Sequence, residues 1–136
     1  MIDENDRISL IEYRMDQAVD TANLAKFLFT SNKLAVAVNR IYYGLYYALT
    51  ALALKYKFET SKHTQLIGWF NKEFIAGNIV DQKYGKTLRN AYQNRTKGDY
   101  DAFVNFSHHE VELMLTEMVE FIEEIKRILN LPVPKN

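Results

Sequence analysis

Apolar positions recur at helical spacing along almost the whole chain, and polar breaks divide them into successive segments. In residues 5–29 apolar side chains follow one another at intervals of three and four, which places them on one helical face. The polar run Thr30-Ser31-Asn32 then predicts a turn. Residues 33–57 predict a second helix that is apolar on nearly every face. Such a helix must be covered on most sides, either at the centre of a bundle or by another subunit.

Two further helices are predicted between residues 60 and 95. Thr60-Ser61 suits the cap of a third helix, which Gly77-Asn78 should end. Asp81 is expected to cap a fourth helix that finishes near Arg95. Lys97-Gly98-Asp99 is expected to form the break after it, because glycine disfavours a helix interior.

The last helix is predicted to open with a capping box, since Ser107 and Glu110 are three positions apart. It should stop before Pro132. Short connections favour antiparallel neighbours, so we expect an all-α fold: an antiparallel up-and-down bundle of four long helices plus a shorter helix. Residues 1–131 are expected to form this single helical domain, with 132–136 as a short C-terminal tail.

Composition excludes several classes of chemistry. The chain has 136 residues and no cysteine, so it can have neither a disulfide framework nor a thiolate nucleophile or metal site. The first residues are acidic and lack the basic-then-apolar order of a signal peptide. We therefore expect a cytoplasmic protein with no membrane association and no cofactor.

The formal net charge is zero, but charge is unevenly distributed along the chain. Residues 55–97 hold nine Lys or Arg against three Asp or Glu, whereas residues 99–127 hold eight acids against two bases. The basic segment could hold a polyanion locally. Alternatively, the basic helices could simply pair with the acidic ones inside the bundle.

Arg95 continues an apolar stripe, because Tyr84, Leu88 and Ala91 precede it at intervals of four, three and four. Its guanidinium should therefore point toward the core or a cleft, where a charge needs a partner. That partner is expected to be either Asp99 or an external anion.

Polar groups also interrupt the second helix, at Asn39 and Arg40. Buried polar groups need partners, so these two side chains and the neighbouring tyrosine hydroxyls should form a network. The network could fix the register of a bundle or dimer, or it could line the same cleft as Arg95. Gly44 lies among the aromatic residues and suggests the close approach of another helix or a ligand.

The three histidines do not form a metal site on spacing alone. His108 and His109 are adjacent, so they point about 100° apart on a helix and cannot hold one metal together. His63 follows Lys62 in the first turn of the third helix, where it is either a surface side chain or a phosphate contact. We expect no metal site.

Several of these residues resemble the motifs of small prokaryotic HEPN proteins. The similar stretches are Asn39–Ala48, Lys62-His63 before Phe70–Phe74, and Arg95-x-x-Gly98-Asp99-Tyr100. The acidic final helix fits as well, so the likeness covers roughly residues 8–129. The resemblance implies an antiparallel α-bundle that dimerises. It also implies kinship with the partners of minimal nucleotidyltransferases in toxin–antitoxin systems.

Many members of that wider superfamily are metal-independent RNases with an Arg-x(4–6)-His motif at the dimer cleft. In that motif the arginine holds phosphate and the histidine performs acid–base chemistry. Arg95 matches the arginine, but Tyr100 stands five residues on, where the resemblance leads us to expect a histidine. Tyrosine is a poor base at neutral pH. We therefore expect weak or undetectable RNase activity from the isolated protein.

Three hypotheses follow. The first is a homodimer that binds nucleotide or RNA phosphate beside a nucleotidyltransferase-like partner, in a toxin–antitoxin, defence or stress system. The second adds metal-independent RNA cleavage at the same site, and the third is an interaction module without a ligand. The candidate catalytic residues are Arg95, Tyr100 and His63, and the candidate phosphate-binding residues are Arg95, Lys97, Arg40, Asn39 and Lys62.

Overall fold

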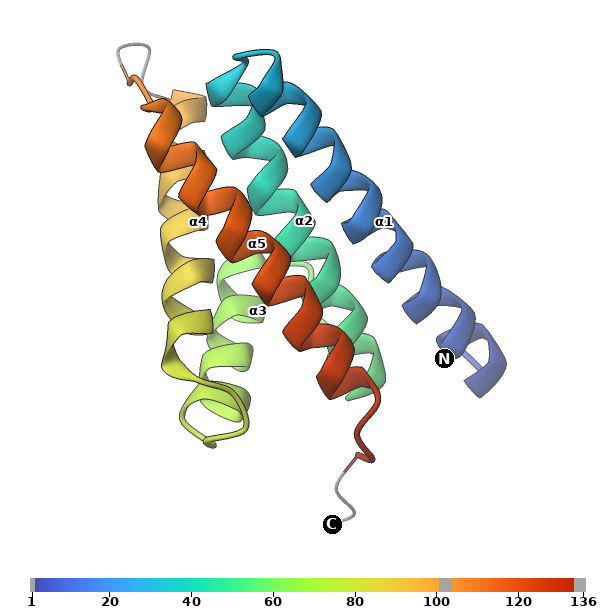
Figure 1. Ribbon diagram of the computed structural model, residues 1–136. Coiled ribbons are helices and arrows are strands. Elements are labelled where there is room, and N and C mark those ends of the chain that lie inside the picture. Colours follow the sequence, from blue (N-terminus) through green and yellow to red (C-terminus); the bar gives the residue numbers. More distant parts are fainter. Residues whose placement is uncertain (1, 101–103, 134–136) are drawn as a thin grey trace.

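The computed structural model describes residues 2–100 and 104–133, and every regular element in these ranges is helical (Figure 1). The elements are α1 (Glu4–Thr30), α2 (Leu34–Lys55), α3 (His63–Phe70), the π-helical turn η1 (Asn71–Ile75), α4 (Gln82–Tyr100) and α5 (His108–Leu129). The four long helices form the predicted all-α bundle, and α3 with η1 is the shorter extra piece. Within the described ranges no helix is both long enough and apolar enough to cross a membrane.

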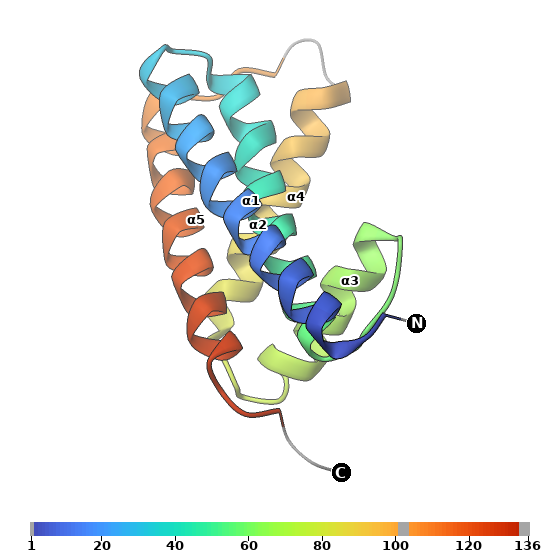
Figure 2. The same cartoon turned by 90° about the vertical axis from the view of Figure 1, so that its right-hand side faces the viewer.

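Helix α2 lies at the centre of the bundle, between α1, α4 and α5 (Figure 2). Half of its length is buried, and Val38, Leu45 and Leu49 have no exposed surface. The other helices of the same chain therefore cover the apolar faces of α2. The sequence had left open that a second subunit covers them. Gly44 marks the close approach of another helix, since a Cβ there would lie 3.1 Å from Sδ of Met118 on α5.

Helix boundaries follow the local caps at both ends of the chain. The Asp3 carboxylate accepts the Asp6 backbone N–H at the start of α1, at 2.8 Å. At the start of α5 Ser107 and Glu110 form the predicted capping box, with bonds of 3.1 Å and 3.0 Å. Each cap satisfies N–H groups that have no partner inside the helix.

The predicted cap of the third helix is wrong. Helix α3 begins at His63, with Lys62 at the cap position and no side-chain cap bond. Thr60 instead accepts the Lys62 backbone N–H at 3.1 Å, so it fixes the connecting segment before the helix. The helix then widens into η1, where the backbone passes close to α4: a Cβ at Gly85 would lie 3.1 Å from the Asn71 side-chain oxygen.

The predicted end of α4 near Arg95 is also wrong, because the helix continues through Lys97-Gly98-Asp99 to Tyr100. A glycine inside a helix costs only about 1 kcal/mol relative to alanine, so tertiary contacts can override it. Gly98 packs closely here, since a Cβ at this position would lie 3.4 Å from the Phe106 ring. The extra turn places Asp99 one turn beyond Arg95 on the same helix.

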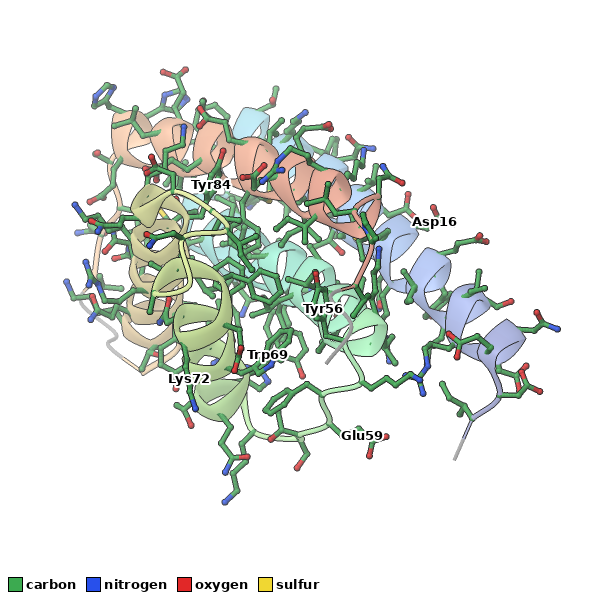
Figure 3. All side chains as sticks on the ribbon, turned by 90° about the horizontal axis from the view of Figure 1, so that it is seen from below. Asp16, Tyr56, Glu59, Trp69, Lys72 and Tyr84 are labelled. Atoms are coloured by element: carbon green, nitrogen blue, oxygen red, sulfur yellow. The ribbon has the colours of Figure 1, made fainter. Side chains whose placement is uncertain are left out.

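Aromatic side chains close the lower end of the bundle (Figure 3). The Trp69 ring of α3 stacks on Phe58 at 5.0 Å and meets the edge of Phe74 at 5.3 Å. Tyr56, just after α2, also packs edge-on against Phe74. These contacts fix α3 and the segment before it against the end of α2.

Candidate functional site

Arg95 extends from α4 toward α2, where two tyrosine rings surround its guanidinium. The guanidinium carbon lies 5.4 Å from the ring centres of both Tyr42 and Tyr43. Nη2 donates a hydrogen bond of 3.3 Å to the Tyr43 hydroxyl. The predicted direction of this side chain is therefore confirmed. Arg95 lies at the junction of α2 and α4, with a fifth of its side chain exposed.

Asp99 is the only carboxylate paired with Arg95 among the described residues. Nε of Arg95 lies 3.0 Å from Oδ2 of Asp99, yet it forms no hydrogen bond, so the contact is an ion pair without hydrogen-bond alignment. Asp99 is 32% exposed and lies one turn away on the same helix. Pairs of this kind contribute about 0.3–0.5 kcal/mol. The pair is weak enough for a stronger anion to replace the carboxylate.

A second guanidinium lies beside the same tyrosine. Nε and Nη2 of Arg40 donate to the Asn39 side-chain oxygen at 3.0 Å and 2.7 Å, and the guanidinium carbon lies 4.9 Å from the Tyr43 ring centre. Asn39 in turn donates to Asp99 at 3.4 Å. The predicted network is confirmed for Asn39 and Arg40, which join the Arg95 pair through Asp99. Among the described residues neither side chain bonds a tyrosine hydroxyl, and Arg40 contacts the Tyr43 ring instead.

His63 joins this cluster from the first residue of α3. Its Nδ1 lies 2.6 Å from the Tyr42 hydroxyl, and its ring stacks on Tyr46 at 4.2 Å. Burial, and then the positive charge of Arg95, lower the pKa of His63 below its ordinary value. His63 is thus partly exposed and packs against the cluster instead of projecting freely into solvent, and the imidazole is neutral at pH 7.

Tyr42 connects the histidine to the arginine. It is completely buried, and burial raises the pKa of its hydroxyl, an effect that the charge of Arg95 only partly offsets. The hydroxyl thus stays protonated and can donate to Nδ1 of His63, which places the histidine proton on Nε2. We call the six side chains Asn39, Arg40, Tyr42, Tyr43, His63 and Arg95, together with Asp99, the arginine cluster.

The remaining candidate residues lie apart from these contacts. Lys62 and Lys97 are exposed, and no contact of either ammonium group with the arginine cluster is found among the described residues. Lys97 is two positions beyond Arg95, so it leaves α4 about 200° away from it. Tyr100 is the last residue of α4, and its side chain lies outside the described part of the structure.

Comparison with protein families identifies the chain. The family model described as the HEPN domain matches residues 11–128. The chain belongs to the HEPN family. This match covers all four long helices in whole or in part, and it includes the entire arginine cluster.

Individual HEPN relatives match over most of their length. The chain is 32% identical to a "UPF0332 protein" of Thermotoga maritima over 92% of this chain and 95% of the relative. It is 30% identical to "Putative toxin MJ0142" of Methanocaldococcus jannaschii, covering 88% and 81% of the two chains. A third relative, "Putative toxin MJ0605" of the same organism, is 28% identical over 88% of both chains.

Sequence reasoning missed Tyr42 in this HEPN chain. The residue falls on the same face of α2 as Val38, Leu45 and Leu49, so its spacing is that of a core position. A hydroxyl on a fully apolar face was the available signal, because a buried hydroxyl needs a partner. That partner, His63, could not be identified without the position of α3.

Proposed function

We propose that this HEPN protein is a homodimer that binds the phosphate of RNA or a nucleotide through Arg95, beside a nucleotidyltransferase-like partner in a toxin–antitoxin, defence or stress system. The observation that carries the proposal is the arginine cluster. It holds two guanidinium groups against one tyrosine ring, and within residues 2–100 and 104–133 the carboxylate that pairs with Arg95 is partly exposed.

Phosphate suits this arrangement better than a carboxylate does. A guanidinium presents several N–H groups in a planar fork that matches phosphate oxygens, and charge-assisted bonds of this kind are strong. The terminal phosphate of a nucleotide carries more negative charge than Asp99, and an RNA phosphodiester matches its charge while offering oxygens that the guanidinium fork can bind bidentately. Neutral His63 adds one more ring nitrogen within the same cluster.

The basic segment carries further exposed cations outside the arginine cluster. Lys62, Lys72, Lys86 and Arg89 are exposed, and none pairs with an acid among the residues that the structure describes. Among the described residues, one ion pair joins the basic segment to α5, between Lys83 and Glu120 at 3.5 Å. Most of the basic segment is therefore not neutralised inside the bundle, which supports an extended polyanion such as RNA.

The exposed face of α1 supports a homodimer. Tyr13, Leu24 and Phe27 on α1 are 58%, 45% and 66% exposed, and Val36 near the start of α2 is 51% exposed. Large apolar side chains that share one surface commonly mark an interface. The face proposed for the second copy is therefore α1 with the start of α2, rather than the buried sides of α2.

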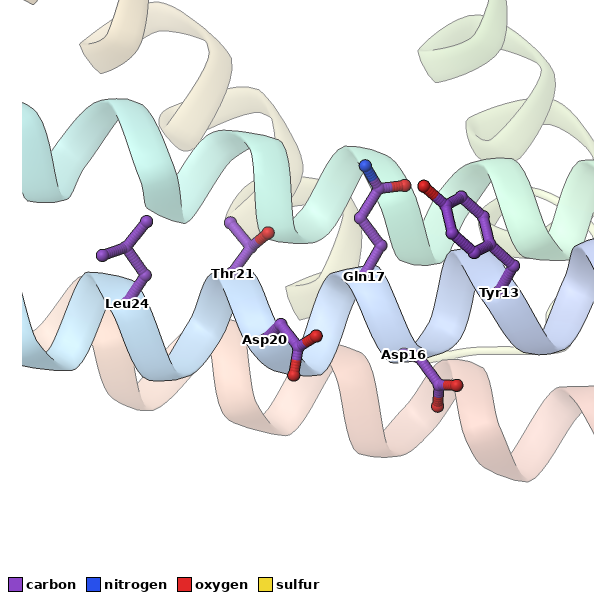
Figure 4. A pocket seen from close by; sticks show the side chains of 6 residues that line it. All are labelled: Tyr13, Asp16, Gln17, Asp20, Thr21 and Leu24. Atoms are coloured by element: carbon purple, nitrogen blue, oxygen red, sulfur yellow. The ribbon is translucent and has the colours of Figure 1, made fainter.

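Apolar and acidic side chains project from different sides of α1 (Figure 4). Tyr13 and Leu24 project on the side of α1 that borders α2, whereas Asp16 and Asp20 project away from it. Together these residues line a shallow hollow of about 240 Å³. A second copy seated on the apolar side of α1 would lie next to α2.

The names of two relatives support the proposed setting, because both are called toxins. The nucleotidyltransferase-like partner is what the family resemblance implies. Co-expression of this chain with the product of a neighbouring nucleotidyltransferase gene should yield a complex that survives size-exclusion chromatography. Separate elution of the two proteins would contradict this part of the proposal.

The position of His63 favours RNA cleavage as a second candidate function. The histidine is neutral near pH 7 and lies in the same cluster as Arg95, so it can accept a proton where Tyr100 cannot. In that role the imidazole would have to change tautomer, so that Nδ1–H donates to the Tyr42 oxygen and the Nε2 lone pair becomes free for the ribose hydroxyl. Metal-independent RNA cleavage that His63→Ala abolishes would establish this function, whereas uncleaved RNA would leave binding alone.

RNA binding is tested by fluorescence anisotropy with a short labelled single-stranded RNA. Arg95→Ala should weaken binding by about tenfold or more, because charge-assisted hydrogen bonds contribute about 1.5–3 kcal/mol. Arg127→Ala removes the same charge from α5 and should leave the affinity nearly unchanged. If wild-type protein binds no RNA or nucleotide at low salt, the interaction module without a ligand is the correct reading.

A further inference from the structure

A pocket of about 300 Å³ lies on α2 below the arginine cluster. Its floor comes from Tyr46 and Thr50 of α2, one wall includes Arg14 of α1, and the other includes Phe58 and Glu59 of the segment before α3. Pockets that hold small ligands have volumes of about 300–1,000 Å³. This pocket is thus at the lower end of the range, and two of its lining side chains are aromatic.

The pocket and the arginine cluster share a wall. Tyr46 lines the pocket, and its ring also stacks on His63 at 4.2 Å. The same ring lies 6.1 Å from the Tyr43 ring, whose centre is 5.4 Å from the Arg95 guanidinium carbon. The sum of these two distances is an upper limit on the separation between the Arg95 guanidinium carbon and the Tyr46 ring centre. One nucleotide can span that separation.

We infer that this pocket is the base subsite of the phosphate site, so that a nucleotide unit lies with its phosphate at Arg95 and its base in the pocket. This inference rests on the proposed function. The shared chemistry is a nucleobase linked to a phosphate, whether it comes from a free nucleotide or from single-stranded RNA. Bases stack on aromatic side chains regardless of sequence, and Tyr46 offers such a ring.

Polar groups at the rim match the edges of a base. Nη1 of Arg14 donates to Gln17, which leaves further guanidinium N–H groups for carbonyl or ring-nitrogen acceptors. Glu59 is an acceptor for exocyclic amino groups. The Thr50 hydroxyl donates to the Tyr47 carbonyl at 2.7 Å, so its oxygen can still accept a hydrogen bond. Donors and acceptors therefore surround a space with an aromatic wall.

The test compares ligands with and without a base on the full-length protein, by isothermal titration calorimetry. A nucleoside 5′-monophosphate should bind at least about tenfold more tightly than ribose 5-phosphate, because stacking on an aromatic ring changes affinity by roughly five- to hundredfold. Thr50→Phe should fill the pocket and reduce nucleotide affinity to that of ribose 5-phosphate. Thr116→Phe, the same change at an exposed position of α5 outside the pocket, is the matched control, and thermal melting shows that both variants fold.

Three results separate this inference from the proposed function. Equal affinity for the nucleotide and ribose 5-phosphate, with loss of both in Arg95→Ala, would overturn the base subsite and leave phosphate binding intact. Nucleotide binding that responds to Thr50→Phe but not to Arg95→Ala would support the pocket and contradict the role of Arg95. Absence of binding by any of these ligands or by short single-stranded RNA would overturn both. Competition between the mononucleotide and that RNA then shows whether the free nucleotide or the RNA binds more tightly.

Discussion

Cations at the C-terminal end and at the middle of α2 have different partners. Near its C-terminal end, Arg7 donates to the Leu54 carbonyl at 2.9 Å, and Lys55 donates to the carbonyls of Leu129 and Leu131. These carbonyls lie in or just after the last turns of α2 and α5. Near the middle of α2, Arg95 contacts a tyrosine hydroxyl, two aromatic rings and one carboxylate, all of them side-chain groups.

The difference separates structural cations from a candidate ligand-binding cation. A cation on helix-end carbonyls satisfies acceptors that have no partner inside the helix, and it opposes the negative end of the helix dipole. Those carbonyls cannot move away without unfolding a helix turn. The Asp99 side chain, by contrast, can rotate into solvent and leave Arg95 to another anion. We therefore expect Lys55 to act on stability and Arg95 on binding.

The largest effect on stability is expected for Lys55→Met, which keeps most of the apolar stem and removes the ammonium group. Hydrogen bonds from charged groups contribute about 1.5–3 kcal/mol, so the free energy of unfolding should fall by roughly that amount. RNA affinity should stay unchanged. Urea denaturation measures the first quantity and anisotropy the second. A variant as stable as wild type would show that the helix-end contacts contribute little.

The dimer face is tested by Phe27→Glu, a change at the exposed end of α1. A charge in a desolvated apolar interface should raise the dimer dissociation constant by about tenfold or more. Leu113→Glu on α5 is the matched control, because Leu113 is 52% exposed but lies off the proposed face. Sedimentation velocity at micromolar concentration should show monomer for the first variant and dimer for the second. A wild-type monomer would contradict the proposed homodimer.

Asp99→Asn tests whether the partner of Arg95 can be replaced by an external anion. The change removes a carboxylate that competes with phosphate for Arg95 and repels it. RNA should bind about two- to fivefold more tightly, in keeping with the modest free energy of a partly exposed ion pair. Asp16→Asn removes the same charge from α1 and serves as the control. Weaker binding in Asp99→Asn would mean that the carboxylate positions Arg95 for the ligand.

The smallest effect concerns the pH dependence of stability at His63. Its pKa is lowered in the folded protein, so the unfolded chain binds more protons below about pH 6.5, and stability falls as the pH falls through this range. His63→Gln should lose less unfolding free energy than wild type between pH 7.5 and pH 5.5. Equal losses in the two proteins would show that His63 keeps an ordinary pKa when folded.

The sequence was a good guide to helices and a partial guide to the site. The capping box at Ser107 was confirmed because both of its partners are local. The end of α4 was wrong because Gly98 costs the helix little and gains contact with Phe106. A break predicted from neighbouring residues takes no account of contacts with residues farther along the chain, such as Phe106.

The arginine cluster was predicted in part for the same reason. Asn39, Arg40 and Arg95 stood out because each is a polar side chain on an otherwise apolar stripe. The link from Arg95 through Tyr42 to His63 joins three helices, so it depends on how α3 crosses α2. Helical spacing within one segment carries no information about that crossing.

The most direct test compares Arg95→Ala and Lys55→Met for both RNA affinity and unfolding free energy. Arg95→Ala should lose about tenfold or more in affinity, and its loss of stability should stay below the roughly 3–5 kcal/mol of a broken buried pair, because its hydrogen bond to Tyr43 is long, at 3.3 Å, and Asp99 is partly exposed. Lys55→Met should show the reverse. The account would be contradicted if Arg95→Ala and Asp99→Ala each destabilised the fold by about 3–5 kcal/mol, as expected for a broken buried pair, while RNA affinity stayed the same.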